Sequence, residues 1–185
     1  YYVVQAKNSV GTSGNSPEFS AALLPAPLAD IAIGGTASDN DNSTPPNAAN
    51  AFDHNPGSEW FHQGTNGWLQ YDLGAGNAQV LKRYTVSSSG DLVPRDPKDW
   101  QLLGSNDGTT WTTLDSQTNQ LFANRLLPTT YVIANPAAYR YYRLNVTANN
   151  GDGVFLDVGE LGLLGDSGRI IPDGTYCVVN RNSNE

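Results

Sequence analysis

The sequence has few charged residues, and basic residues are the scarcer kind. Charged side chains make up 15% of the 185 residues, and 18 Asp and Glu outnumber 10 Lys and Arg, which gives a net charge of −8. Nucleic acid is disfavoured as a partner, because phosphate contacts need clustered Lys and Arg. Acidic polysaccharides and anionic membranes are disfavoured for the same reason. We therefore expect neither nucleic acid nor a membrane among the partners.

Cysteine, methionine and long apolar runs are also missing or nearly so. The single cysteine, Cys177, cannot build a disulfide framework or a zinc cluster within this chain. No apolar run approaches transmembrane length, and we expect no signal peptide within these residues. Because the chain contains no Met, we expect it to begin inside a longer parent protein.

Short strands joined by turns account for much of what is present. Leu69, Tyr71 and Leu73 alternate with polar residues or Trp, and Tyr142, Leu144 and Val146 repeat this period of two. Spacers rich in Gly, Asn, Ser and Thr separate these runs, and no convincing amphipathic helix is visible. The pattern predicts an all-β protein with an antiparallel β-sandwich.

The stretch from Arg95 to Trp111 is the most informative part of the chain. It reads as a strand, an Asn-Asp-Gly turn and a second strand, with Gly108 able to take the positive φ of a tight hairpin. As a string of residues it closely resembles the discoidin domains, also called coagulation-factor C-type domains (F5/8 type C). This resemblance implies a discoidin-like jelly roll. It also implies kinship with the carbohydrate-binding modules found beside the catalytic domains of secreted bacterial glycoside hydrolases.

Three segments can be separated along the chain. Residues 1–24 resemble the C-terminal strands of a fibronectin type III domain, of which most would be missing. Residues 25–166 form the discoidin-like carbohydrate-binding module, after the short stiff linker Pro25-Ala-Pro27. Residues 167–185 resemble the start of a ricin-type β-trefoil lectin domain, or form a linker.

The loop from Asn47 to Trp60 resembles the discoidin loop that holds one structural calcium ion. From spacing alone, its acids are better read as solvated residues beside an ordinary turn. The resemblance instead implies an all-oxygen shell, which suits Ca²⁺. The ligands carried over from the family are the residues Asn50, Asp53, Asn55, Ser58, Gly159 and Glu160. The ion would act as a staple between an early loop and the last strand.

Three loops are candidates for a sugar site at one end of the sandwich. A sugar site needs planar polar groups for the hydroxyls and an aromatic side chain for a C–H face. The loops at residues 61–65, 89–97 and 149–153 offer the candidate ligand-binding residues Phe61, His62, Asp91, Arg95, Asp96, Asn149, Asn150 and Asp152. Two other interpretations remain open: a local Arg95–Asp96 salt bridge, and ordinary turn chemistry at 149–153. Among the Trp residues, Trp60, Trp68 and Trp100 are expected in the core, and Trp111 half-buried.

The function implied is that of a non-catalytic carbohydrate-binding module with structural calcium, which targets an attached glycoside hydrolase to glycans. The alternatives are a ligand-free structural spacer, or an adhesion domain that binds protein or lipid. We expect no catalysis by this chain, because no motif for a hydrolytic or phosphate-binding site is present. We expect a monomer, covalently linked to its catalytic domain, with carbohydrate as partner. The resemblance implies secretion to the extracellular space.

Overall fold

The computed structural model describes residues 10–11, 27–40 and 47–166. The predicted flanking segments at 1–24 and 167–185, including Cys177, therefore lie outside the described residues, apart from residues 10 and 11. Among the described residues, no helix is long and apolar enough to cross a membrane.

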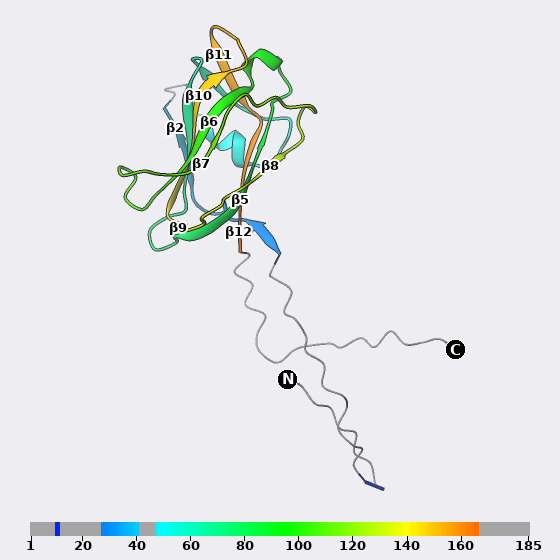
Figure 1. The fold of residues 1–185 in the computed structure, drawn as a ribbon, viewed down its shortest axis with the longest axis vertical. Helices are drawn as coiled ribbons and strands as arrows, with labels where there is room; N and C mark the ends of the chain where they lie inside the picture. The colour runs from blue at the N-terminus through cyan, green and yellow to red at the C-terminus, as the bar shows by residue number, and fades with distance from the viewer. Residues whose placement is uncertain (1–9, 12–26, 41–46, 167–185) are drawn as a thin grey trace, which may run out of the picture.

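Two antiparallel sheets make up most of the folded part of the chain (Figure 1). The first sheet has the order β1-β12-β5-β8, with β9 paired to β5. Its strands are β1 (Leu28–Asp30), β5 (Gln79–Ser87), β8 (Thr129–Val132), β9 (Ala138–Tyr139) and β12 (Glu160–Asp166). The second sheet has the order β2-β4-β10-β6-β7. Its strands are β2 (Thr36–Asp39), β4 (Gly67–Asp72), β6 (Pro97–Ser105), β7 (Thr112–Gln117) and β10 (Tyr141–Asn149).

A separate two-stranded ribbon and two 3-10 helices complete the described elements. The ribbon pairs β3 (Trp60–Gln63) with β11 (Phe155–Val158), so that Phe61 lies opposite Asp157. The helices are η1 (Ala48–Phe52) and η2 (Val93–Arg95). In Figure 1, β11 lies at the end of the molecule opposite to β1 and the last residues of β12. The ribbon therefore lies at the end of the fold away from Leu28 and Asp166, the first residue of β1 and the last residue of β12.

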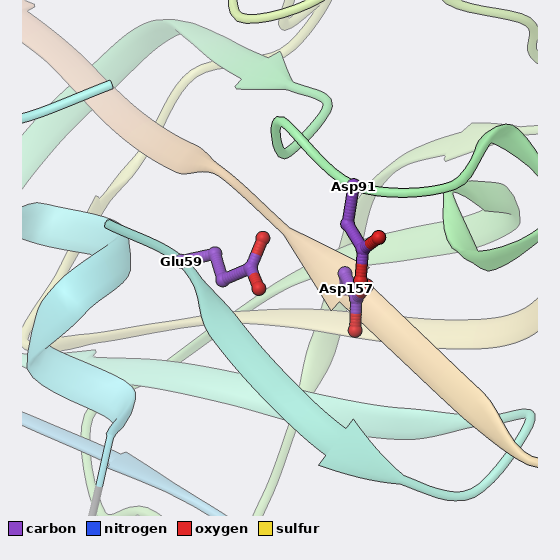
Figure 2. A group of neighbouring side chains, drawn as sticks. All are labelled: Glu59, Asp91 and Asp157. Carbon is purple, nitrogen blue, oxygen red and sulfur yellow. The ribbon is translucent and has the colours of Figure 1, made fainter. Parts of the chain in front are cut away.

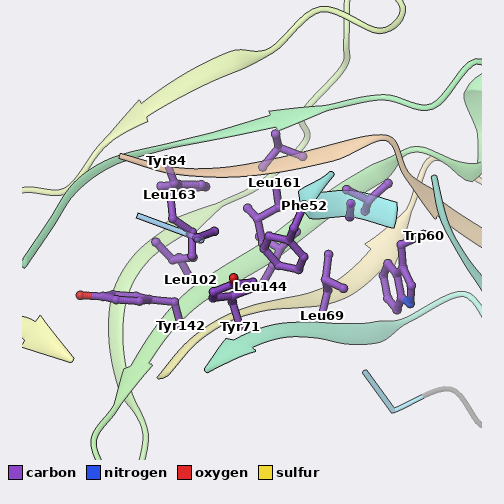
Figure 3. Packing of buried hydrophobic residues seen from close by; sticks show 14 of the residues in the cluster. Phe52, Trp60, Leu69, Tyr71, Tyr84, Leu102, Tyr142, Leu144, Leu161 and Leu163 are labelled. Atoms are coloured by element: carbon purple, nitrogen blue, oxygen red, sulfur yellow. The ribbon is translucent and has the colours of Figure 1, made fainter. Parts of the chain in front are cut away.

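The core lies between the two sheets, which confirms the predicted β-sandwich. Buried side chains of β4, β6 and β10, such as Leu69, Leu102 and Leu144, face those of β5 and β12 (Figure 3). The largest buried aromatics also have partners for their polar atoms. Trp100 Nε1 donates to Tyr84 Oη at 3.0 Å, and Tyr84 Oη donates to Asp115 Oδ2 at 2.7 Å. Since buried polar groups are costly without partners, this chain of hydrogen bonds ties the two sheets together.

The Asn-Asp-Gly hairpin between β6 and β7 is confirmed. Gly108 has a φ of 73°, and Asp107 Oδ1 accepts the backbone N–H groups of Thr109 and Thr110 at 2.8 and 2.7 Å. These bonds lower the pKa of the Asp107 carboxyl group. The turn is thus fixed by local chemistry that the sequence displays.

The expectation that Trp68 lies in the core is wrong, and one strand departs from regular alternation. Trp68 lies on the solvent face of β4. There the Arg143 guanidinium lies between the rings of Trp68 and Trp111, with its Cζ atom 4.1 and 4.0 Å from the two ring centroids. The alternation along β5 is interrupted, because Leu81 and Tyr84 are both buried although they are three residues apart. A register irregularity between Leu164 and Gly165 of the partner strand accounts for the change of face.

Candidate functional site

The short helix η1 is fastened to the start of β3 by two asparagine side chains. Asn47 Nδ2 donates to the Phe61 carbonyl oxygen at 2.8 Å, and Asn50 Nδ2 donates to the Glu59 carbonyl oxygen at 3.0 Å. On the other side of η1, Phe52 packs on Tyr71 with ring centroids 4.9 Å apart. The helix thus holds the loop that follows it against the core. The oxygen atoms of this loop then face one another.

Those oxygen atoms gather around the hydroxyl group of Ser58. Ser58 Oγ lies 2.9 and 2.8 Å from the two carboxylate oxygens of Asp53, and 2.8 Å from the Asn55 carbonyl oxygen. The Asn50 carbonyl oxygen lies at 3.5 Å. A serine hydroxyl has one hydrogen to donate, so it can serve only one of these four oxygens at a time. Asp53 Oδ1 and the Asn55 carbonyl oxygen also accept the backbone N–H groups of Asn55 and Ser58, at 2.8 and 3.0 Å, which leaves acceptors still in excess. Such a surplus of acceptors is typical of a site that binds a hard cation.

Glu160, the first residue of β12, adds a second carboxylate to this group. Its carboxyl group lies against that of Asp53, and its Oε1 atom is buried without a hydrogen-bond partner. Burial, and then the Asp53 carboxylate, raise the pKa of Glu160 to about 7. Burial also acts to raise the pKa of Asp53, but hydrogen bonds from the Asn55 N–H and the Ser58 hydroxyl outweigh it and lower the pKa. All the candidate metal ligands here are oxygen atoms, and such a ligand set fits a calcium ion.

Gly159 lies between β11 and β12, where the chain passes close to the end of β5. Its N–H donates to the Ser87 carbonyl oxygen at 3.0 Å, and a Cβ atom at this position would lie 2.5 Å from the Ser88 carbonyl oxygen. Only glycine fits so close to another backbone. This contact fixes the start of β12, and with it the position of Glu160.

The outer face of the β3–β11 ribbon carries a second group of side chains. Phe61 and Phe155 lie side by side with ring centroids 4.9 Å apart, and the Arg95 guanidinium lies 4.7 Å from the centroid of Phe155. Arg95 also forms ion pairs with Asp91 and, through Nε at 3.3 Å, with Asp152. The loop that contains η2 is therefore fastened over the ribbon by one cation.

Three carboxylates meet beside Arg95: those of Glu59, Asp91 and Asp157 (Figure 2). Each has a ligand oxygen within 4.8 Å of the others. Asp157 is fully buried, and its nearest cationic atom is Arg95 Nη1 at 3.7 Å. Burial, and then the Glu59 carboxylate, raise the pKa of Asp157 to about 7. This acidic group could hold a metal ion.

An open groove of about 650 Å³ lies beside the start of β3. The loop before β3 and the loop after β5 form its walls, together with Leu126. Its lining combines one aromatic ring with amide, hydroxyl and carboxylate groups, from the residues Asn47, Asn50, Ser58, Glu59, Phe61 and Asp91. Its volume is within the range of small-molecule sites.

A sequence model of the F5/8 type C domain matches residues 34–161. The chain belongs to the F5/8 type C domain family. This confirms the resemblance to discoidin domains. The fibronectin and ricin-type segments remain predictions.

Solved F5/8 type C and related domains share the fold. A chitosan-binding module from a Paenibacillus sp. IK-5 chitosanase/glucanase has a TM-score of 0.60 at 19% identity, over 73% of this chain and 98% of that one. The family 32 carbohydrate-binding module of Clostridium perfringens NanJ, in complex with galactose, has a TM-score of 0.59 at 17% identity, over 75% and 98%. An F5/8 type C domain from Bacteroides fragilis has a TM-score of 0.60 at 18% identity, over 76% and 97%.

A curated relative matches a shorter part of this F5/8 type C domain. The peptide-N(4)-(N-acetyl-beta-glucosaminyl)asparagine amidase of Arabidopsis thaliana is 41% identical over 92 residues. The match covers 48% of this chain but 13% of that protein. The chain therefore spans a small part of the length of this relative.

The structure brings together four of the eight side chains expected at the ligand site. Phe61 and Asp91 line the groove, and Arg95 and Asp152 adjoin it through their ion pairs. The open interpretation of a local Arg95–Asp96 salt bridge is wrong, because Arg95 pairs with Asp91 and Asp152 instead.

The other four side chains hold the F5/8 type C domain together and are left out of the candidate site. His62 is buried on the core side of β3 and stacks on Trp60 at 5.4 Å, because alternate strand residues face opposite ways. Asp96 is buried against Arg125. Asn149 Nδ2 donates to the carbonyl oxygens of Asp152 and Phe155, which confirms the turn interpretation. Asn150 Nδ2 lies against backbone carbonyls of residues 96, 97 and 120.

Two acidic residues of the site, Glu59 and Asp157, were missed from the sequence. Glu59 sits between Ser58 and the buried Trp60, and Asp157 lies in an otherwise apolar strand. An acid inside an apolar strand is a signal that could have been used. Its partners could not have been named, because the pairing of β3 with β11 joins residues nearly 100 positions apart along the sequence.

Proposed function

We propose that this F5/8 type C domain is a non-catalytic carbohydrate-binding module. The observation that carries the proposal is the groove at the loop end, where Phe61 is surrounded by amide and carboxylate groups. An aromatic ring can stack on a sugar C–H face while planar polar groups bind hydroxyls. Related domains support the class of ligand: one is described as binding chitosan, and another was solved with galactose.

The role of such a module is to raise the local concentration of substrate around an attached enzyme. We infer that a catalytic domain, in particular a glycoside hydrolase, is linked to this chain and secreted with it. Linking two modules makes the second encounter intramolecular, so that a weak single site can be effective. A monomer is sufficient for this purpose. Phe61 of β3 lines the groove, and β11, which pairs with β3, lies at the end of the fold opposite to β1 (Figure 1), which suits a tethered domain.

We propose further that the oxygen group around Ser58 holds a structural calcium ion. Asp53 and Glu160 would supply carboxylate oxygens, Ser58 its hydroxyl, and Asn50, Asn55 and Gly159 backbone carbonyls. The support is the excess of acceptors around Ser58 Oγ and the unpaired buried oxygen of Glu160. When bound, the ion supplies positive charge that holds the 47–59 loop to β12.

A binding screen tests the main proposal. The chain is screened against galactosides, chitosan oligosaccharides and β-glucans in the presence of Ca²⁺, and the best ligand is measured by calorimetry. We expect Phe61→Ala to weaken binding about tenfold, because it removes the flat ring. Phe61→Leu should weaken it similarly while it keeps more of the packing against Phe155.

The matched control is Trp111→Ala. This variant removes an aromatic side chain that stacks on Arg143 beside β7, in the second sheet. It should leave the affinity unchanged. Circular dichroism verifies that each variant is folded. If the folded wild-type chain binds none of these glycans, the proposal is contradicted. The alternative of a ligand-free structural spacer would then stand in its place. Release of chromogenic sugar in a hydrolysis assay would contradict the non-catalytic role.

A second candidate function is adhesion to a lipid or protein surface. Leu92, Val93 and Val154 are each at least half exposed, and Asp152 N–H donates to the Pro94 carbonyl oxygen, so that their loops adjoin. Exposed apolar side chains at a loop end can enter a membrane or a partner. Co-sedimentation with neutral and anionic vesicles separates the two functions, because binding that survives excess sugar favours adhesion.

A further inference from the structure

The acidic group of Glu59, Asp91 and Asp157 shares no side chain with the oxygen group around Ser58. Asp53 and Glu160 are not part of it, and its three carboxylates come from the residue before β3, from the loop after β5 and from β11. Figure 2 shows the Glu59 side chain extended toward the other two carboxylates. Two of its members, Glu59 and Asp91, also line the groove.

Asp157 is the member that points to a ligand. Its side chain has an exposed fraction of 0%, and neither carboxylate oxygen accepts a hydrogen bond. The nearest cationic atom, Arg95 Nη1, lies 3.7 Å from Oδ2, beyond hydrogen-bond distance. Buried charges are normally paired or bound to a metal ion, so this carboxylate calls for a counter-charge within reach.

Arg95 alone cannot balance the charge of this region. It forms ion pairs with Asp91, Asp152 and Asp157, and Glu59 lies beside them. Arg125, the other nearby cation, is bonded to the Asp96 carboxylate and to the backbone of Asp91. Four carboxylates therefore share one guanidinium among the described residues here, which leaves an excess of negative charge.

We propose that Glu59, Asp91 and Asp157 form a second cation site, which holds a divalent ion such as Ca²⁺ on the groove side of the β3–β11 ribbon. Carboxylate oxygens from three segments suit a hard cation, and water can complete the shell on the open side. The ion links the loop after β5 to the ribbon and shares with Arg95 the neutralisation of Asp157. This inference does not depend on sugar binding by the groove.

The test counts calcium ions in the full chain. Metal-stripped protein is titrated with Ca²⁺ by calorimetry, and bound ions are counted by equilibrium dialysis. We expect two ions in the wild-type chain and one in Asp157→Asn, with the affinity of the lost ion reduced at least tenfold. The matched control is Asp166→Asn, which removes an exposed carboxylate that pairs with Lys82, and it should keep two ions.

Glu160→Gln separates the two groups. It should retain one ion, and the double variant Glu160→Gln/Asp157→Asn should bind none. If the double variant folds poorly, terbium luminescence sensitised by the nearby aromatic rings gives an independent count of the ions bound by the single variants. An unchanged ion count in Asp157→Asn would overturn the proposal. It would also be overturned if glucosamine, but not Ca²⁺, bound in an Asp157-dependent manner, since the group would then bind an ammonium ion.

Discussion

At the scale of the residue, Glu160 shows how a buried carboxyl group responds to its neighbours. Its carboxyl group is packed against that of Asp53, and its pKa is raised from 4.5 to about 7. A group with a raised pKa in the folded state binds more protons there than in the unfolded chain between these two values. Its contribution to stability is therefore fully present below about pH 4.5 and is lost as the pH rises toward 7.

The metal-free chain should accordingly unfold at a lower temperature at pH 8 than at pH 5. Glu160→Gln removes the titrating group, so the difference between the two pH values should become smaller in this variant. Part of the difference should persist, because the pKa of Asp157 is raised in the same direction. Thermal unfolding in EDTA at both pH values measures the effect. An identical pH difference in wild type and Glu160→Gln would contradict it.

At the scale of the element, β6 depends on a glycine where it passes beneath an aromatic ring. Gly104 pairs with Tyr142 of β10, and a Cβ atom at residue 104 would lie 2.5 to 2.9 Å from atoms of the Tyr139 ring. Tyr139 packs edge-to-face on Tyr142, so the ring has little room to move. The close approach of β9 to the second sheet thus requires a residue without a side chain.

Gly104→Ala should destabilise the fold by about 1–3 kcal/mol, since overpacking displaces a side chain that is already in contact. Gly153→Ala is the matched control, because a Cβ atom there meets nothing within 4 Å and the backbone is not left-handed. Urea unfolding of both variants measures the free energies of unfolding. Equal stabilities would show that the Tyr139 ring yields without cost.

The strands and the hairpin could be predicted because their signals are local. Period-two alternation places Leu69 and Tyr71 on the core face, and the Asn-Asp-Gly turn carries its own hydrogen-bond acceptor. The candidate site was harder to predict, because it depends on which residues of β3 face the core and on the pairing of β3 with β11. His62 was expected at the ligand site because residues 61–65 were predicted as a loop, whereas β3 continues to Gln63 and its alternation places His62 on the buried face. The neighbours of Asp157 become visible only in the folded chain.

At the scale of the whole molecule, the chain closes on itself at both ends of the sandwich. Leu28 of β1 pairs with Asp166 of β12, and at the other end of β12 Glu160 lies against the 47–59 loop. In the folded state these contacts bring together residues more than 100 positions apart along the sequence. An ion that binds the folded chain at this loop, and has no comparable site in the unfolded chain, stabilises the entire domain.

Calcium should therefore raise the unfolding temperature of the whole domain in one cooperative transition. With Ca²⁺ at about 100 times the dissociation constant of the Ser58 group, that site adds about 2.7 kcal/mol to the free energy of unfolding. Glu160→Gln should lose this increment, while the increment from the Asp157 group remains. Mg²⁺ should stabilise less, because it gives up its water shell reluctantly. Calorimetric unfolding in Ca²⁺, Mg²⁺ and EDTA measures the differences. The staple between the loop and β12 would be contradicted if Glu160→Gln retained the full response to Ca²⁺, because the ion would then stabilise the domain without the carboxylate that joins the two.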